Sequence, residues 1–135
     1  MRVPRATTGC TAVSRPSRHW LCPFPQYGPG RKHERLIALA GRQRAIVGRH
    51  PGWLVRGLIH SDGCRATKRI RRHDGTGHHA YPRYFFSNKS TDIDGLFGDA
   101  LDRLGIAWRF SRPTVISIAR SGAVARLDAI VGPKY

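Results

Sequence analysis

The chain has 135 residues, which is enough for one domain with one hydrophobic core. Its 24 Lys and Arg residues outnumber its 8 Asp and Glu residues and give a formal net charge of +16, so a polyanion is the expected partner, with a merely solvated basic surface as the alternative. No apolar run approaches the about 18 residues needed to span a bilayer, and no secretory signal follows Arg2 and Arg5, so a membrane is not an expected partner.

The first 33 residues predict a basic arm rather than part of the folded domain, which is expected over residues 34–135. Pro and Gly recur in the arm, and neither helical nor strand periodicity is sustained. A basic arm can lie along nucleic acid, and plain disorder is an equally good interpretation. Three aromatic residues could pin its second half to the domain, namely Trp20, Phe24 and Tyr27.

A first helix is expected over about residues 35–48, and His50-Pro51-Gly52 ends it. Residues near one face of this helix repeat at the helical period. They are Leu36, Leu39, Gln43, Ile46 and Val47.

The next helix is expected over about residues 52–62, and Pro51 suits its first turn. Gly57 costs a helix interior about 1 kcal/mol relative to Ala. Gly57 and Ser61 share one helix face, where two small residues allow another backbone to come close. Asp62 falls in the last turn, where the helix dipole disfavours a carboxylate by about 0.3–1 kcal/mol, so a nearby cation is expected. The ordinary alternative is an amphipathic helix that ends in an Asp-Gly turn, with Gly63 as a simple capping glycine.

Two strands follow, joined by a glycine-containing turn over residues 73–79. The first strand covers residues 64–72 and has two faces by alternation. One face is polar throughout, with Arg65, Thr67, Arg69 and Arg71, and the other carries Ala66, Lys68, Ile70 and Arg72. The second strand covers residues 80–87, where Pro82 predicts an edge or a bulge.

A helix is then expected over residues 91–104, capped by Ser90 and ended by Gly105. Strands follow over residues 106–110 and 114–119, and a last helix over residues 121–131. From Pro51 onward the order is helix, strand, strand, helix, strand, strand, helix. The predicted fold class is therefore α+β.

The three cysteines, Cys10, Cys22 and Cys64, are widely spaced and form no CxxC pair, which argues against a disulfide framework. A reducing, cytoplasmic location is expected. A zinc site is the alternative for Cys64, with three histidines of the following turn as its partners, but no known zinc spacing is matched. These histidines, which a solvated loop explains more simply, are His73, His78 and His79.

The stretch Val55–Gly63 resembles the nine-residue signature of the LAGLIDADG homing endonucleases. Five positions match that signature outright, namely Gly57, Leu58, Ile59, Asp62 and Gly63. The αββαββα order is also that of one LAGLIDADG domain, in which the helices pack on one face of a curved four-stranded antiparallel sheet. The resemblance covers about Pro51–Tyr135 and extends weakly to Phe24–Gly30, a lead-in similar to that of small bacterial relatives labelled transcriptional regulators. Residues 1–19 do not match the helix-turn-helix that precedes the domain in several of those relatives.

The resemblance implies a homodimer, because the chain has one signature and the family pairs two signature helices. The interface would use one face of the helix, with Leu54, Gly57, Leu58 and Ser61. It also implies that Asp62 and Gly63 from two chains hold Mg²⁺ or another divalent cation, and that a two-fold symmetric dimer reads a roughly palindromic DNA site. Lys134 would be the basic catalytic residue of the family, although a solvated terminal lysine explains it as well.

The resemblance assigns double-stranded DNA to the polar strand faces. The best candidates for contact are on the first strand, joined by three residues of the others; they are Arg65, Thr67, Arg69, Arg71, Arg83, Arg109 and Ser117. Ile70 is expected to be buried on the opposite face.

Three functions fit these observations. The first is a metal-dependent, site-specific double-strand DNA endonuclease. The second is a non-cleaving DNA-binding transcriptional regulator with the same fold. The third is a basic RNA-binding or ribosome-associated protein, which explains the charge but leaves the signature helix unexplained.

Overall fold

The structure is a computed structural model, and it describes residues 6–7, 10–11 and 29–133. Most of the predicted arm, with its three aromatic residues, lies outside the described residues, as does Lys134. Within the described part of the arm, β1 (Ala6–Thr7) pairs antiparallel with β2 (Cys10–Thr11), and η1 (Lys32–Glu34) is a short 3₁₀ helix.

The first helix of the domain, α1 (Gly41–Arg49), begins six residues later than the sequence predicts. Residues 35–40 are not helical, so that part of the prediction is wrong. The backbone N–H of Ile37 donates to the Asp92 carboxylate at 2.8 Å, and the Gln43 side chain accepts from the Ala40 N–H at 2.9 Å. The Asp92 and Gln43 side-chain oxygens thus bind backbone N–H groups just before Gly41. These hydrogen bonds stabilise the non-helical backbone of residues 35–40, so they favour a helix that begins at Gly41.

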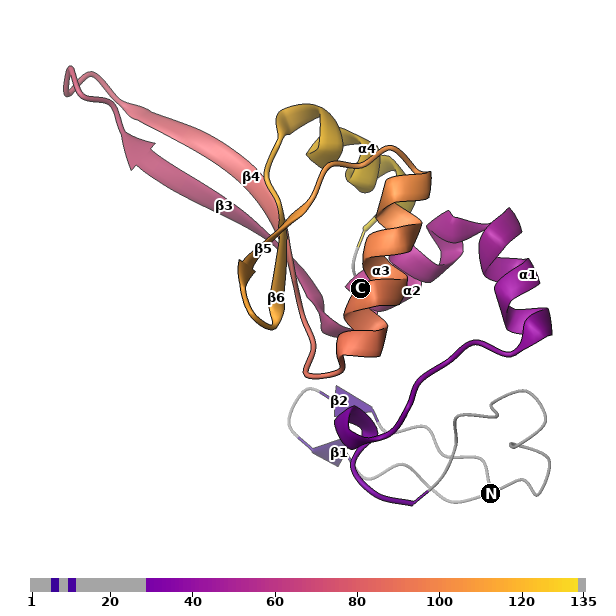
Figure 1. The fold of residues 1–135 in the computed structure, drawn as a ribbon. Helices are drawn as coiled ribbons and strands as arrows, with labels where there is room; N and C mark the ends of the chain where they lie inside the picture. Colours follow the sequence, from indigo (N-terminus) through magenta and orange to yellow (C-terminus); the bar gives the residue numbers. More distant parts are fainter. Residues whose placement is uncertain (1–5, 8–9, 12–28, 134–135) are drawn as a thin grey trace.

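From α2 onward the order of elements confirms the prediction (Figure 1). They are α2 (Pro51–Asp62), β3 (Gly63–Arg71), β4 (His78–Ser87), α3 (Thr91–Arg103), β5 (Arg109–Arg112), β6 (Val115–Ile118) and α4 (Ser121–Val131). The four strands of this sheet follow the order β3-β4-β6-β5 and pair antiparallel throughout. The fold is therefore α+β with the helices to one side of the sheet.

Pro82 lies in β4 without a break in the register between β3 and β4. The pairing with β6 covers only residues 84–87, so at Pro82 the strand has β3 as its one neighbour. The missing N–H of proline therefore breaks no ladder bond on the β6 side, so Pro82 has a local edge position although β4 is an interior strand of the sheet.

The core lies between the sheet and α2, α3 and α4. Tyr84 and Phe86 of β4 are buried, and the Phe86 ring meets the Phe97 ring of α3 with centroids 4.4 Å apart. Val55 and Ile59 of α2 are fully buried against the same cluster. Because side chains alternate along a strand, the buried residues fix which sheet face the helices cover, and none of the described helices lies on the opposite face.

The far end of the β3–β4 hairpin projects beyond the helices (Figure 1). Ile70 lies in this part of the hairpin and is 46% exposed, so the expectation that it is buried is wrong. Its position beyond the core explains the difference, because none of the helices that the structure describes reaches that part of the strand. Within the described residues, no helix is long and apolar enough to cross a membrane.

Candidate nucleic-acid interface

Acidic residues are absent from the strands of the four-stranded sheet. The strands β3 to β6 contain seven Lys and Arg residues and neither Asp nor Glu. All eight acidic residues of the chain lie in helices or in the turn between β3 and β4. The sheet is therefore the part of the molecule best suited to a polyanion.

The helix-free face of the sheet is built from in-register rows. One row crosses all four strands and runs Cys64, Phe85, Ser117, Arg109. Further along the hairpin the facing pairs are Ala66 with Arg83, Lys68 with Tyr81, and Ile70 with His79. Three of the predicted DNA-contact residues, Arg83, Arg109 and Ser117, thus share this face.

The other four predicted contact residues, Arg65, Thr67, Arg69 and Arg71, lie on the opposite face of β3. The alternation predicted for this strand is confirmed, but the seven candidates do not form one surface. Arg65 pairs across the ladder with the buried Tyr84, which places its side chain on the helix side. Thr67, Arg69 and Arg71 are exposed on the projecting part of the hairpin.

Arg65 is held by α4. Its Nε and Nη2 donate to the two carboxylate oxygens of Asp128 at 2.8 and 3.0 Å, and the Tyr84 hydroxyl donates to the same carboxylate at 2.6 Å. The hydrogen bond from Arg65 lowers the pKa of Asp128 below its usual value, and burial is the main reason that the pKa of Tyr84 rises to about 12. Arg65 is therefore engaged within the fold.

Aromatic residues lie beside the cations of the helix-free face. They were not predicted as site residues from the sequence. The Arg83 guanidinium lies 5.7 Å from the centroid of the Phe85 ring, and Tyr81 is 45% exposed beside Lys68. The run Tyr84-Phe85-Phe86 is apolar at every position, so periodicity alone does not tell which residues point to the core.

The exposed face of α2 carries the residues predicted for a dimer interface. Gly57 and Ser61 are exposed, and Leu54 and Leu58 are half-buried against the core cluster. A Cβ added to Gly57 would meet nothing within 4 Å, so packing within the described chain does not require glycine there. Trp53, one turn before Gly57, is 68% exposed and extends the same stripe. Sequence reasoning missed Trp53, although its i, i+4 spacing to Gly57 was available.

Asp62 is exposed at the end of α2, where its carboxylate accepts a hydrogen bond of 3.2 Å from the Asn88 amide. Gly63 follows with extended backbone at φ −97°, so it is not a left-handed capping glycine. A Cβ on Gly63 would lie 2.7 Å from the Ile59 Cα, which leaves no room for a side chain. Glycine is therefore required by the tight junction between α2 and β3. Asn88 was not predicted from the sequence.

The donor set at this junction fits half of a divalent-metal site. Each chain places one carboxylate, that of Asp62, at this junction next to Gly63, whereas Mg²⁺ accepts one or two carboxylates and keeps several waters. No group of three His, Cys, Asp or Glu side chains that could hold a metal occurs among the described residues. A second copy would have to supply the remaining carboxylate.

No family model matches the chain, and no curated protein matches it in sequence. Two solved structures of homing endonucleases are similar to part of its fold. One is I-CvuI in complex with the I-CreI target in the presence of 2 mM Mg, in which the DNA is not cleaved; it has a TM-score of 0.46 and 16% identity over 62% of this chain. The other is I-TnaI, with a TM-score of 0.46 and 21% identity over 59% of this chain. The chain spans 55% of each, about half their length, and likenesses this partial carry no argument about function.

Proposed function

We propose that the protein binds double-stranded DNA across the helix-free face of its sheet, as a homodimer that pairs its α2 helices. The observation that supports this proposal is the charge of the sheet: its four strands carry no carboxylate, and Lys68, Arg83, Arg109 and Arg112 lie on the helix-free face. A two-stranded antiparallel ribbon fits the DNA major groove, which is about 12 Å wide. The nine residues of β3 would extend about 30 Å along it.

The α2 stripe supports the dimer. An exposed helix glycine costs about 1 kcal/mol, and no contact within the described chain accounts for Gly57. Close approach of a second α2 helix would account for it, with Trp53 and Ser61 on the same stripe and Leu54 and Leu58 beside it. A symmetric pair of this kind reads two half-sites related by a two-fold axis.

We further propose that the dimer cleaves DNA with a divalent metal. Asp62 and the Gly63 carbonyl from both copies would hold Mg²⁺, which polarises a phosphate and supplies an activated water when bound. Asn88 orients the Asp62 carboxylate through its amide hydrogen bond. Lys134, outside the described residues, stays a candidate basic residue. We place the protein in a reducing cytoplasm, where the exposed Cys64 remains a thiol.

A non-cleaving DNA reader is the second candidate. One observation favours it, namely that each copy offers a single carboxylate at the junction, already hydrogen-bonded to Asn88. A transcriptional regulator of this kind needs the same sheet face and the same dimer, but no metal.

The experiment that separates these functions uses a random library of duplex DNA incubated with purified full-length protein, with and without Mg²⁺. Bound sequences and cut sequences are recovered separately. Enriched palindromic sequences that are also cut only with Mg²⁺ support the nuclease, and enrichment without cutting supports the reader. Failure to retain duplex DNA at low salt would overturn both.

A further inference from the structure

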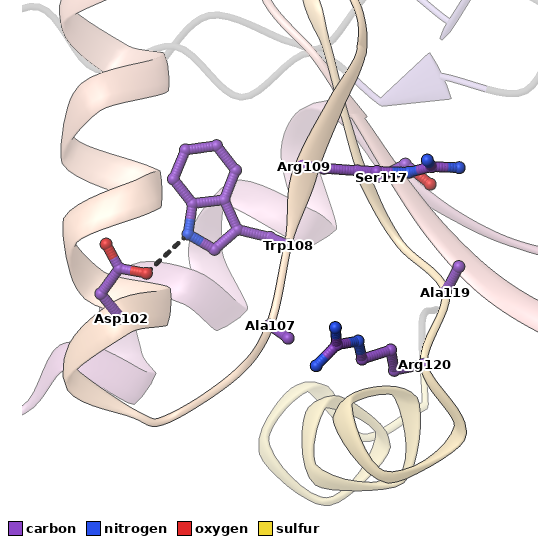
Figure 2. Close-up of a pocket in the computed structure, with 7 residues that line it drawn as sticks. All are labelled: Asp102, Ala107, Trp108, Arg109, Ser117, Ala119 and Arg120. Carbon is purple, nitrogen blue, oxygen red and sulfur yellow. Dashed lines mark hydrogen bonds between the residues drawn. The ribbon is translucent and has the colours of Figure 1, made fainter.

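We propose that the pocket at the start of α4 binds a phosphate of the DNA backbone through Arg120, Arg109 and Ser117. This inference rests on the proposed function and adds a contact beyond the sheet, because Arg120 is the N-cap residue of α4. The pocket has a volume of about 720 Å³ and lies where the chain enters β5, leaves β6 and begins α4 (Figure 2).

The buried hydroxyl of Ser117 indicates that the pocket binds a ligand. It is 2% exposed, and its Oγ has no hydrogen-bond partner within the described structure, although it lines the pocket. A buried hydroxyl without a partner costs free energy, so such groups are rare unless another molecule satisfies them. A phosphate oxygen would accept a hydrogen bond from the Ser117 hydroxyl.

The charge around Ser117 is positive. Arg109 faces Ser117 across the ladder, and neither Arg109 nor Arg120 forms an ion pair with any other described residue. The first turn of the 11-residue helix α4 has neither a side-chain cap nor an acidic residue, so its positive end is not neutralised there. Two guanidinium groups, a hydroxyl and a helix start are the usual parts of a phosphate site.

Asp102 is the one acidic residue that lines the pocket, and its carboxylate forms a hydrogen bond away from Ser117. Its Oδ1 accepts a hydrogen bond of 2.8 Å from the Trp108 indole Nε1. Figure 2 shows Trp108 and Arg109 extending to opposite sides of the chain, with Asp102 on the indole side. The carboxylate therefore lies on the opposite side of the chain from Ser117.

A backbone phosphate fits this pocket better than a free anion, because the pocket is continuous with the proposed DNA surface. Ser117 and Arg109 belong to both. A duplex across the helix-free face would bring a phosphate to the rim at Arg120.

The first test compares Arg120→Ala with Arg44→Ala, which removes the same charge from an exposed position on α1. Fluorescence anisotropy of a labelled duplex is measured over a range of salt concentrations. Arg120→Ala should weaken binding several-fold and reduce the slope of log affinity against log salt by about 0.9 per pocket engaged. Arg44→Ala should resemble wild type.

The second test uses Ser117→Ala, whose two expected effects have opposite signs. Loss of an unsatisfied buried hydroxyl should raise the midpoint of thermal unfolding of the free protein. Loss of the donor should weaken DNA binding by about two- to tenfold with an unchanged salt slope. Ser111→Ala is the matched control, because that hydroxyl already donates to the Val115 carbonyl.

The outcomes are distinguishable. If wild type binds DNA and Arg120→Ala matches Arg44→Ala, the pocket proposal is overturned and the proposed function stands. If wild type does not bind duplex DNA, both are overturned. If inorganic phosphate at millimolar concentration shifts the Trp108 indole NMR signal while Arg120→Ala binds DNA like wild type, the pocket binds a free anion and the backbone assignment is wrong.

Discussion

Asp128 joins α4 to the base of the hairpin through two partners, Arg65 and Tyr84. Both partners of the ion pair are partly exposed, so the pair itself contributes little, whereas the hydrogen bond from the buried Tyr84 is worth more. This arrangement explains how Arg65, a polar residue, lies on the side of the sheet that the helices cover.

Replacement of Asp128 by Ala should lower the free energy of unfolding at pH 7 by about 1–2 kcal/mol. The pKa of Asp128 is lowered in the fold, so its stabilisation is present above the unfolded value near 3.8 and is lost as the pH falls through the folded pKa. Urea denaturation at pH 7 and at pH 3 should therefore show a difference between variant and wild type that shrinks in acid. Asp99→Ala, at an exposed position of α3, is the control and should change little.

Asp62 is the residue at which the nuclease and the reader differ. Asp62→Asn should abolish Mg²⁺-dependent cleavage and leave metal-free DNA affinity unchanged or higher, because a negative charge near phosphate is removed. The amide oxygen can still accept from Asn88, so the fold should persist. Cleavage assays and anisotropy on the same preparations measure both effects. Unfolding of this variant would make Asp62 a structural residue and remove the support for a metal site.

At the scale of elements, α2 offers a direct test of dimerisation. Gly57→Leu should separate the paired helices and yield a monomer with weakened DNA binding. Gly95→Leu is a matched control, since Gly95 is also an exposed helix glycine whose added Cβ would meet nothing within 4 Å. Light scattering should show Gly95→Leu as a dimer. A dimer that persists in Gly57→Leu through the same surface would contradict the packing argument.

The hairpin allows a comparison of neighbours on opposite faces. Lys68 lies on the helix-free face, and Arg69 on the other. Lys68→Ala should weaken duplex binding and lower the salt slope more than Arg69→Ala does, although both remove one charge from an exposed position. Anisotropy titrations at several salt concentrations measure this. Equal losses would indicate that DNA contacts the hairpin edge and not the face.

Much of the element order could be predicted from the sequence, because helical and strand periods follow from core packing. The orientation of β3 could not. Beyond Arg65 the strand leaves the core, so both of its faces are exposed, and alternation shows which residues share a face but not which face the helices cover. The start of α1 could not be predicted either, because Asp92, 55 residues away, binds the Ile37 N–H.

At the candidate site, the α2 stripe and Asp62 were found from the sequence, since both depend on spacing within one helix. Arg83, Arg109 and Ser117 were named without knowledge of the face they share. Asn88 and Arg120 were missed, because they reach the site only through tertiary contacts or lie at a junction between elements.

At the scale of the whole molecule, the strands of the four-stranded sheet carry cations without any carboxylate, whereas the helices carry both. Five cations per copy lie on the helix-free face or at its tip, namely Lys68, Arg72, Arg83, Arg109 and Arg112. If two copies engage DNA with all of them, the slope of log affinity against log salt should approach about −9. A slope near zero would contradict an electrostatic interface.

The junction at Asp62 and Gly63 has no loop, since α2 ends at residue 62 and β3 begins at residue 63. A side chain at residue 63 would collide with Ile59, so glycine lets the strand begin directly after the helix. The helix α2 and the β3–β4 hairpin are therefore joined directly, without a linker that could change the angle between them. In a symmetric pair, the angle between α2 and the hairpin, and not the length of any linker, would set how many base pairs separate the two half-sites.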